Sequence, residues 1–400
     1  MNRKEFIASC GIIGTATVIT PAIASANILK PEQNQKIRVA IIGCGSVSGV
    51  YLPHLSKSPF VKLTSVCDIK PERAKALAEQ FGVPNQYPHI DKLLAGADFD
   101  LMINLTDMQE HGRLNKQALL AGKSVWSEKP LANSYNEGKE LLELAKKQGV
   151  RIWGAPAVVN SPQFAFMAKQ INDGKLGRIA AAHAHYGHLG PSWSAFFYER
   201  GGGSLPDLGV YNLTTLSGLL GPVKSVMAMT NILTPNRTVD DKGDIKVEAE
   251  DNASVLMEHQ SGAISHVQSG FNYFDPYGHH GKGQEKPTVS VVGKKGSMHL
   301  IGYDWMPFGV DMATLEHEEP QRFVTDPGTY AWEQGASVIC ESLVTGKEPL
   351  INAEHSLHVL EIIEAARKSQ EEGKRIQRSE ERRGGKECRF WWSPDDLKGG

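Results

Sequence analysis

The chain has few cysteines, almost no net charge and no internal repeat or low-complexity tract. Its five cysteines, at positions 10, 44, 67, 340 and 388, show no Cys-x-x-Cys spacing, which excludes a disulfide scaffold and predicts free, mostly buried thiols. The 43 basic and 45 acidic residues form no long block of one sign, so we expect no nucleic-acid partner. With 40% hydrophobic and 22% charged residues, the 400-residue chain is typical of globular proteins and long enough for two domains.

One apolar stretch, 11–23, stands out near the amino end. It follows Arg3 and Lys4 and ends in Ala24-Ser25-Ala26, which fits the small-x-small cleavage rule of export signals. We therefore predict a signal peptide over 1–26, export to the bacterial periplasm and no stable membrane insertion afterwards. Residues 2–7 resemble a twin-arginine signal with Lys in place of the second Arg, which leaves the general secretory route open. A membrane anchor is disfavoured because a spanning helix needs ~20 apolar residues.

The carboxyl end divides into a helical and an irregular part. Helical periodicity over 354–372, closed by Gly373, predicts a last helix that packs back on the N-terminal domain. Residues 379–400 show no periodicity and carry the run Phe390-Trp391-Trp392. This tail resembles a read-through product of cloning or assembly, so we predict a non-native, disordered segment.

From residue 37 onward, short apolar runs alternate with helical patterns. The apolar runs are 37–42, 63–67, 101–105, 124–127 and 150–153. Helical patterns such as 72–81 and 135–148 lie between them, which predicts a parallel Rossmann sheet over 37–155. The first run ends in a Gly-x-Gly-x-x-Ser loop, where glycine permits a tight turn and close approach to a pyrophosphate at a helix N-terminus. Its candidate cofactor contacts are Gly43, Gly45, Ser46 and Val47, although methyl-donor enzymes also use such loops.

Asp68 directly follows the second apolar run, where a carboxylate can accept hydrogen bonds from the adenosine ribose hydroxyls. An anion at this position repels a 2′-phosphate and favours NAD over NADP, although the nearby Lys70 would soften that repulsion. The alternative role for Asp68 is to cap the helix that begins at Pro71-Glu72.

Glu128-Lys129-Pro130 follows the 124–127 run, at the carboxyl edge where such sheets bind ligands. Together with the Gly-rich loop, Asp68, Asn104-Leu105-Thr106, His111 and Ala121-Gly122-Lys123, it resembles the Gfo/Idh/MocA family of oxidoreductases, glucose-fructose oxidoreductase among them, over about 37–376. The resemblance implies an N-terminal Rossmann domain and a C-terminal α/β domain, over 156–376, with a large open, mostly antiparallel sheet. It further implies homo-oligomers, an active site between the domains, and cofactor contacts from Leu105, Thr106, His111, Glu128 and Lys129.

By this resemblance Lys129 is the catalytic lysine. An ammonium near the reacting oxygen can stabilise alkoxide character as hydride leaves a carbinol carbon, and it can lower the pKa of a neighbouring base. A surface lysine before a proline turn is the alternative interpretation.

In the second half, the Gly-rich segment 201–211 matches the family's Asp-x-x-x-His pair, with Tyr211 in place of the histidine. Some family members carry Tyr at this place. Four-residue spacing on a helix puts Asp207 and Tyr211 on one face, so both are candidate catalytic and substrate residues, as is Lys129. Because a free phenol has a pKa near ~10 against ~6.5 for imidazole, Tyr211 would need a cation such as Lys129 to accept a proton. The alternative role for Asp207 is a helix cap.

Other candidate substrate contacts carry weaker signals. Many relatives have an Arg where this chain has 157–162, and Asn160 is its candidate replacement. Tyr186 and Trp193 belong to an aromatic cluster, with Phe196, Phe197 and Tyr198, that suits a core or interface better than a sugar contact. His183 and His185 share one strand face and His188 falls on the other, so no metal site is expected. Tyr273, Tyr277, His279 and His280 form a Gly-rich loop that could reach the site or a subunit contact.

These features predict an exported oxidoreductase that moves hydride between a sugar, glycoside or polyol and NAD, handling the proton with Lys129, Asp207 and Tyr211. Because free NAD is scarce outside the cytoplasm, we expect a tightly held cofactor. One substrate would reduce it and a second would reoxidise it, or both steps would occur within one catalytic cycle. A glycoside 3-dehydrogenase and a redox-neutral glycosidase are specific versions of this prediction. A non-catalytic sugar-binding protein with a decayed site is the rival, and the intact Glu128-Lys129-Pro130 speaks against it.

Overall fold

The computed structural model describes residues 36–275 and 285–378. The predicted signal peptide, the predicted tail 379–400, and Tyr277, His279 and His280 lie outside the described residues. Within the described part of the chain, no helix has the length and apolar composition that crossing a membrane requires.

The N-terminal part forms a six-stranded parallel sheet with the strand order β3-β2-β1-β4-β5-β6. Its strands are β1 (Ile37–Ile42), β2 (Val61–Cys67), β3 (Asn85–Tyr87), β4 (Leu101–Asn104), β5 (Ser124–Ser127) and β6 (Ile152–Gly154). Its helices are α1 (Ser48–Leu55), α2 (Pro71–Phe81), α3 (Ile90–Ala95), the 3-10 turn η1 (Met108–Glu110), α4 (His111–Leu120) and α5 (Tyr135–Gln148). This is the doubly wound Rossmann order, which confirms the predicted fold. Such sheets bind ligands at the carboxyl ends of β1 and β4, where the strand order reverses.

The strand boundaries differ from the sequence prediction in a few places. The short edge strand β3 was not predicted, because Asn85–Tyr87 carries no apolar run. β4 ends at Asn104, one residue before the predicted limit, and β6 covers Ile152–Gly154 instead of 150–153. Backbone hydrogen bonding at sheet ends, which leaves no trace in apolar composition, sets these limits.

The C-terminal part forms a nine-stranded sheet with the order β16-β15-β14-β13-β7-β12-β11-β8-β17. Only the β7–β12 pair in it is parallel among the described strands, which confirms the expected mostly antiparallel sheet. Its strands are β7 (Ile179–Gly187), β8 (Val223–Asn231), β11 (Asn252–His259), β12 (Ile264–Gly270), β13 (Pro287–Gly293), β14 (Gly296–Tyr303), β15 (Met306–Thr314), β16 (His317–Phe323) and β17 (Ile376–Gln377). A separate hairpin consists of β9 (Asn236–Val239) and β10 (Gly243–Lys246).

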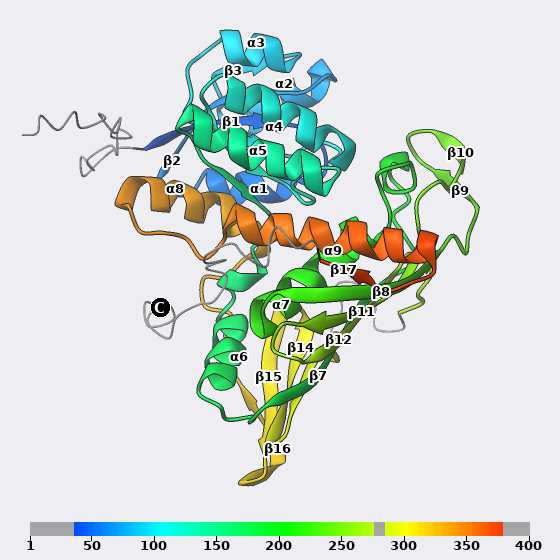
Figure 1. The fold of residues 1–400 in the computed structure, drawn as a ribbon. Helices are drawn as coiled ribbons and strands as arrows, with labels where there is room; N and C mark the ends of the chain where they lie inside the picture. Colours follow the sequence, from blue (N-terminus) through cyan, green and yellow to red (C-terminus); the bar gives the residue numbers. More distant parts are fainter. Residues whose placement is uncertain (1–35, 276–284, 379–400) are drawn as a thin grey trace, which may run out of the picture. The chain divides into compact units, whose positions relative to one another are not determined.

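Helices cover one face of this sheet and connect it to the Rossmann part (Figure 1). They are η2 (Val158–Asn160), α6 (Pro162–Asn172), the π-helix η4 (Leu205–Gly209), α7 (Val210–Leu220) and α9 (Ala353–Glu372), while η3 (Ala195–Phe197) lies in the connection after β7. By contrast, η6 (Trp332–Gln334) and α8 (Gly335–Thr345) pack on the Rossmann part, against α1 and β1. The last helix, α9, packs against both α5 and β8. Ser356 Oγ donates to Gly154 O of β6 at 3.2 Å, and Ser369 Oγ accepts from Ala228 N of β8 at 3.0 Å. One helix therefore hydrogen-bonds to both sheets.

Three cysteines fall in the described residues, and all three are free and buried, as predicted. Burial raises the pKa of Cys44, Cys67 and Cys340 to about 12 in each case. These thiols therefore stay protonated at neutral pH and act as small apolar groups.

Candidate active site

The Gly-rich loop lies tightly against the end of β4. Gly43 has a φ of +92°, and a Cβ atom placed on it would lie 2.6 Å from the Leu105 carbonyl carbon and 2.7 Å from Thr106 N. Glycine is therefore required at this position. At Gly45 the nearest neighbour of such a Cβ is Arg73 Nη1, 3.8 Å away, so the backbone there is open on that side. Ser46 and Val47 then lead into α1.

The Asp68 carboxylate braces this loop. Its Oδ2 accepts from Cys44 N at 2.7 Å, and its Oδ1 accepts from Lys70 N at 2.7 Å. The N-cap residue of α2 is Lys70, without a side-chain cap bond, so Asp68 does not have the alternative role of helix cap. Each carboxylate oxygen keeps capacity for a further hydrogen bond, which a ribose hydroxyl can donate.

These residues fit a dinucleotide. The open backbone at Gly45 and the N-terminus of α1 suit a pyrophosphate, while Asp68 stands where a ribose binds in such sheets. NAD held there would present its nicotinamide along the carboxyl edge of β4 and β5, where the remaining candidate residues lie.

Three predicted cofactor residues follow β4. Leu105 is buried, and Thr106 Oγ1 donates to Asn104 Oδ1 at 2.7 Å. The buried His111 ring lies between two carbonyls, with Nδ1 2.7 Å from Pro130 O and Nε2 3.0 Å from Thr106 O. Burial lowers the pKa of His111 against the opposing effect of these two carbonyls. His111 thus ties the segment after β4 to the segment after β5.

Glu128 holds the segment that carries Lys129. Its Oε1 accepts from the Tyr51 hydroxyl at 2.6 Å, and its Oε2 accepts from Lys129 N at 2.9 Å. The Tyr51 hydroxyl in turn accepts from Trp126 Nε1 at 3.3 Å. Both Glu128 and Tyr51 are buried, so hydrogen bonds from the protein interior hold the backbone at Lys129 in place.

The structure brings Lys129, Asp207 and Tyr211 together. Lys129 Nζ lies 2.5 Å from Asp207 Oδ1 and 2.9 Å from Asp207 O. The same ammonium lies over the Tyr211 ring, 5.2 Å from its centroid. The side chains of Lys129 and Asp207 are 13% and 9% exposed, so this ion pair is largely withdrawn from water yet still reachable. The ammonium belongs to the Rossmann part and the carboxylate to the C-terminal part, as an active site between two domains requires.

Asp207 lies inside the π-helix η4, which runs directly into α7, and the residue that caps α7 is Gly209. Asp207 is therefore not a helix cap. Tyr211 follows in the first turn of α7. Burial, followed by the charges of Glu128, Asp207 and Asp304, raises the pKa of Tyr211 well above its ordinary value. Because Lys129 meets the face of the ring instead of offsetting these charges, the phenol stays protonated and can donate a hydrogen bond.

The other predicted substrate residues differ in exposure. Asn160 ends η2, and its Nδ2 is buried without a partner among the described residues. Tyr186 is buried, with its ring centroid 4.5 Å from that of Tyr303 and 6.1 Å from that of Tyr211. It therefore packs against Tyr211 as a core residue. Trp193 is 50% exposed and packs edge-on against Phe197. Tyr273 lies beyond the end of β12, and its hydroxyl donates to Asn252 Oδ1 of β11 at 2.7 Å.

His183 and His185 of β7 and His188, the residue directly after this strand, divide between two faces, as the alternation predicts. On the more open face, His183 stacks on His266 with ring centroids 4.9 Å apart, and the two Nδ1 atoms are 2.8 Å apart. Within the described ranges, no three His, Cys, Asp or Glu side chains gather into a group that could hold a metal ion. His188 falls on the inner face, where Gly190 N donates to its Nδ1 at 2.9 Å.

Sequence reasoning missed several residues around this site. They are Tyr51, Arg73, His188 and Asp304. The signal for His188 was present, because alternation places it on the same face as Tyr186. Burial lowers the pKa of His188, and the charge of Asp207 opposes this effect while that of Lys129 adds to it. Nothing in the sequence marked Asp304, because it approaches Tyr211 from a strand turn far along the chain.

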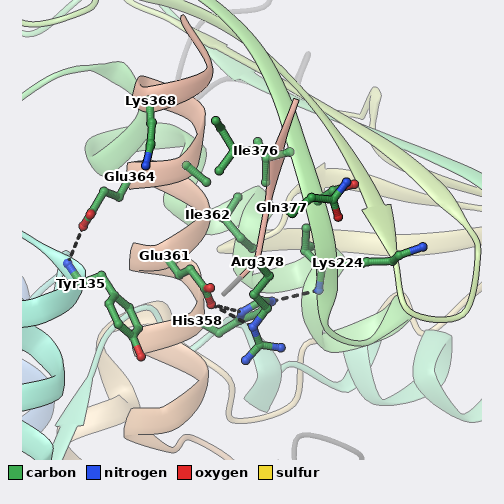
Figure 2. Close-up of a pocket in the computed structure, with 14 residues that line it drawn as sticks. Tyr135, Lys224, His358, Glu361, Ile362, Glu364, Lys368, Ile376, Gln377 and Arg378 are labelled. Atoms are coloured by element: carbon green, nitrogen blue, oxygen red, sulfur yellow. Dashed lines mark hydrogen bonds and ion pairs between the residues drawn. The ribbon is translucent and has the colours of Figure 1, made fainter. Parts of the chain in front are cut away.

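A separate cavity of about 150 Å³ lies between α9, β8 and β17 (Figure 2). Ile362, Ala365 and Ile376 contribute to its apolar lining. At its rim Glu361 Oε2 accepts from Arg378 Nε at 3.1 Å, and both side chains are largely buried. The lining contains none of the residues around Lys129, so this cavity is distinct from the candidate active site.

Comparison with known proteins gives this geometry a family. The protein-family model described as "Oxidoreductase family, NAD-binding Rossmann fold" matches residues 37–155, and the family model of the Gfo/Idh/MocA C-terminal domain matches residues 164–299. The chain belongs to the Gfo/Idh/MocA family of NAD-binding oxidoreductases. Membership makes the chain an NAD-binding oxidoreductase, and several relatives are named as dehydrogenases or reductases of sugars and inositols.

Individual members of the family are distant from this chain. D-apiose dehydrogenase of Rhizobium rhizogenes is 22% identical over 85% of this chain and 97% of the relative. Inositol 2-dehydrogenase of Rhizobium meliloti is 23% identical over 70% of this chain and 79% of the relative. The aldose-aldose oxidoreductase of Caulobacter crescentus, crystallised with glycerol, superposes with a TM-score of 0.72 at 23% identity, over 86% of this chain and all (100%) of that one. The WlbA dehydrogenase of Bordetella pertussis, crystallised with NADH and UDP-GlcNAcA, gives 0.69 at 21% identity, over 86% and 99%.

Proposed function

We propose that this family member oxidises a ring carbinol of a sugar, glycoside or polyol, or reduces the corresponding ketone, with Lys129, Asp207 and Tyr211 as its catalytic residues. The observation that carries the proposal is the ion pair of 2.5 Å between Lys129 and Asp207 beside the Tyr211 ring. This ion pair joins the segment that follows β5 of the nucleotide-binding part to the helix η4 of the second part. The names of relatives such as D-apiose dehydrogenase and inositol 2-dehydrogenase support a polyhydroxylated substrate.

Bound NAD supplies a nicotinamide ring whose C4 accepts the hydride. In the oxidative direction the C–H bond of the carbinol breaks and its O–H proton must leave. The Lys129 ammonium can pass one of its protons to Asp207 while it takes up the proton of the alcohol. The C–H electron pair leaves as hydride, the C=O bond forms, Lys129 stays charged, and Asp207 becomes the neutral acid. The proton that leaves the alcohol is therefore accounted for by Lys129 and Asp207, two residues that are already hydrogen-bonded.

Tyr211 acts as a hydrogen-bond donor to the reacting oxygen in this scheme. Three carboxylates, Glu128, Asp207 and Asp304, oppose ionisation of the phenol, so it does not act as the base at neutral pH. A neutral donor aimed at an oxygen that gains negative character stabilises the transition state. Asn160, whose Nδ2 lacks a partner among the described residues, offers a second donor to a substrate hydroxyl.

We further propose NAD in preference to NADP. The buried Asp68 carboxylate, fixed by Cys44 N and Lys70 N, places a negative charge where a 2′-phosphate would come. Lys70 and Arg73 lie nearby and reduce this repulsion without removing it.

Export to the periplasm is a separate proposal, based on the basic, apolar and small-residue order of 1–26. An exported enzyme meets little free NAD, so a tightly retained cofactor that turns over between two substrates follows from it. Self-association into a homo-oligomer is proposed from the family resemblance alone.

Replacement of Lys129 by Ala tests the proposed function. We expect turnover of any sugar substrate to fall by at least about 100-fold, because the proton path and the positive charge at the reacting oxygen are both removed. NAD affinity should change little, since the Gly-rich loop and Asp68 do not contact Lys129 Nζ. The measurement combines calorimetric NAD titration with nicotinamide absorbance in a sugar and polyol screen.

The matched control is Lys139→Ala, which removes an exposed lysine from α5. It should leave both NAD affinity and turnover unchanged. A Lys129→Ala protein that still reduces NAD at the native rate would overturn the proposal, whatever the identity of the sugar.

A further inference from the structure

We propose that Asp304 is a positioning residue of the site, whose buried carboxylate holds the first turn of α7, and with it Tyr211, against the Lys129–Asp207 pair. The proposal rests on the proposed function for its chemistry, while the positioning itself can be tested without turnover.

The hydrogen bonds of Asp304 join a strand turn to the helix that carries Tyr211. Asp304 lies between β14 and β15 and is 2% exposed. Its Oδ2 accepts from Asn212 Nδ2 at 2.9 Å and from Thr215 Oγ1 at 3.0 Å. Both donors belong to α7, and Asn212 directly follows Tyr211. The carboxylate is therefore a fixed anchor for the start of this helix.

The residues on either side of Asp304 pack against Tyr186, whose ring lies beside that of Tyr211. Tyr303 and Trp305 stack on each other with centroids 5.6 Å apart. Tyr186 lies 4.5 Å from the Tyr303 ring and 6.1 Å from the Tyr211 ring. The turn that contains Asp304 is thus linked to Tyr211 by two indirect routes, the hydrogen bonds to α7 and the ring of Tyr186.

Asp304 also differs from an ordinary structural carboxylate. Besides the two α7 side chains, the backbone N–H groups of Asp304 and Trp305 favour its charged form, while Asn212 Oδ1 is buried without a partner among the described residues. A buried carboxylate that depends on these donors loses stability when one of them moves away. Burial raises the pKa of Asp304 to about 6, so its charge changes within the range in which enzymes work.

Several other titratable or charged groups surround Tyr211 and Asp304, and their effects on Tyr211 must be distinguished from that of Asp304. Those that face Tyr211 or Asp304 from the packed elements are Tyr51, Glu128, Lys129, Tyr186, Asp207, Tyr303 and Tyr330. Only the replacement of Asp304 itself isolates its effect from theirs.

The experiment compares native protein with Asp304→Asn, which keeps an acceptor oxygen for Asn212 and Thr215 but carries no charge. In protein labelled with ¹³Cζ-tyrosine, the Tyr211 resonance, assigned with Tyr211→Phe, should shift with an inflection near pH 6 in the native protein. The inflection should vanish in Asp304→Asn. With a sugar substrate, kcat/KM of the native enzyme should fall as the pH drops through the same range, and Asp304→Asn should show no such step and about fivefold lower kcat/KM at pH 8.

The control is Asp311→Asn on β15, whose carboxylate pairs with Arg322 away from Tyr211. It should keep the inflection. Thr215→Val removes a hydrogen bond that lowers the pKa of Asp304, so it should move the inflection to higher pH, and it covers the case in which Asp304→Asn does not fold. An inflection that persists in Asp304→Asn overturns the proposal. Failure of the proposed function would instead appear as absent turnover in the native protein, with the resonance shift intact.

Discussion

At the scale of single residues, the site is defined by three carboxylates around Tyr211, of which Asp207 pairs with a cation, Lys129. The other two are held by neutral donors, Tyr51 at Glu128 and the α7 side chains at Asp304. A negative surplus around a phenol is suited to hydrogen-bond donation. It is unsuited to proton abstraction by that phenol, which moves the proton transfer to the lysine and aspartate.

Buried histidines give the fold a sensitivity to acid. His259 is fully buried, with Nδ1 2.7 Å from Gly221 O and Nε2 2.7 Å from Ser265 Oγ. Burial lowers the pKa of His259 from 6.5 to about 4. Between these values the unfolded chain binds more protons than the folded one, so stability is lost as the pH falls from 6.5 toward 4.

We therefore expect His259→Asn, which keeps an N–H toward Gly221 O, to lose less stability than the native protein on acidification. The difference should reach on the order of 2 kcal/mol between pH 7.5 and pH 4.5. Urea unfolding at the two pH values measures it. The exposed His317→Asn on β16 serves as control, and equal acid sensitivity of the native and His259→Asn proteins would refute the explanation.

At the scale of elements, the Gly-rich loop and the end of β4 form one unit. The positive φ of Gly43 and the 2.6 Å approach to the Leu105 carbonyl leave no room for a side chain. The same loop is held at its second residue by Asp68. Cofactor binding and the packing of β1 against β4 therefore depend on the same atoms.

Gly43→Ala should accordingly weaken NAD binding by at least about 10-fold and destabilise the fold by roughly 1–3 kcal/mol. Gly49→Ala is the matched control, because a Cβ there meets nothing within 4 Å and lies inside α1. It should leave binding intact and stabilise the helix slightly. Calorimetric titration with NAD and thermal melts distinguish the two variants, and equal behaviour of both would contradict the steric argument.

Elements with a strong local pattern were predictable from the sequence, and those defined by partners were not. The periodicity of 135–148 predicted α5 to its observed limits, Tyr135–Gln148, because a capping serine and a terminal glycine bracket it. The four-residue spacing of Asp207 and Tyr211 predicted a shared helix face, and the structure places both side chains beside Lys129, a contact that the spacing alone did not predict. The strand β3 and the residue Asp304 gave no such signal, since each is defined by a neighbour that only the folded chain brings close.

At the scale of the whole molecule, export and cofactor supply are linked. If the chain works outside the cytoplasm, protein purified from the periplasmic fraction should carry about one NAD or NADH per chain after prolonged dialysis, released only by acid. Enzymatic cycling of the acid extract measures this ratio. A binding site that is empty after dialysis and refills only at millimolar NAD would refute cofactor retention and leave the Lys129 chemistry untouched.

The double packing of α9 has a consequence for biosynthesis. This helix packs against α5 of the nucleotide-binding part and β8 of the second sheet, and its serines hydrogen-bond to β6 and β8. A nascent polypeptide that has not yet released residues 353–372 from the ribosome lacks the surface that α9 offers to both halves. Docking of the two halves through α9 therefore follows the synthesis of both sheets' earlier strands.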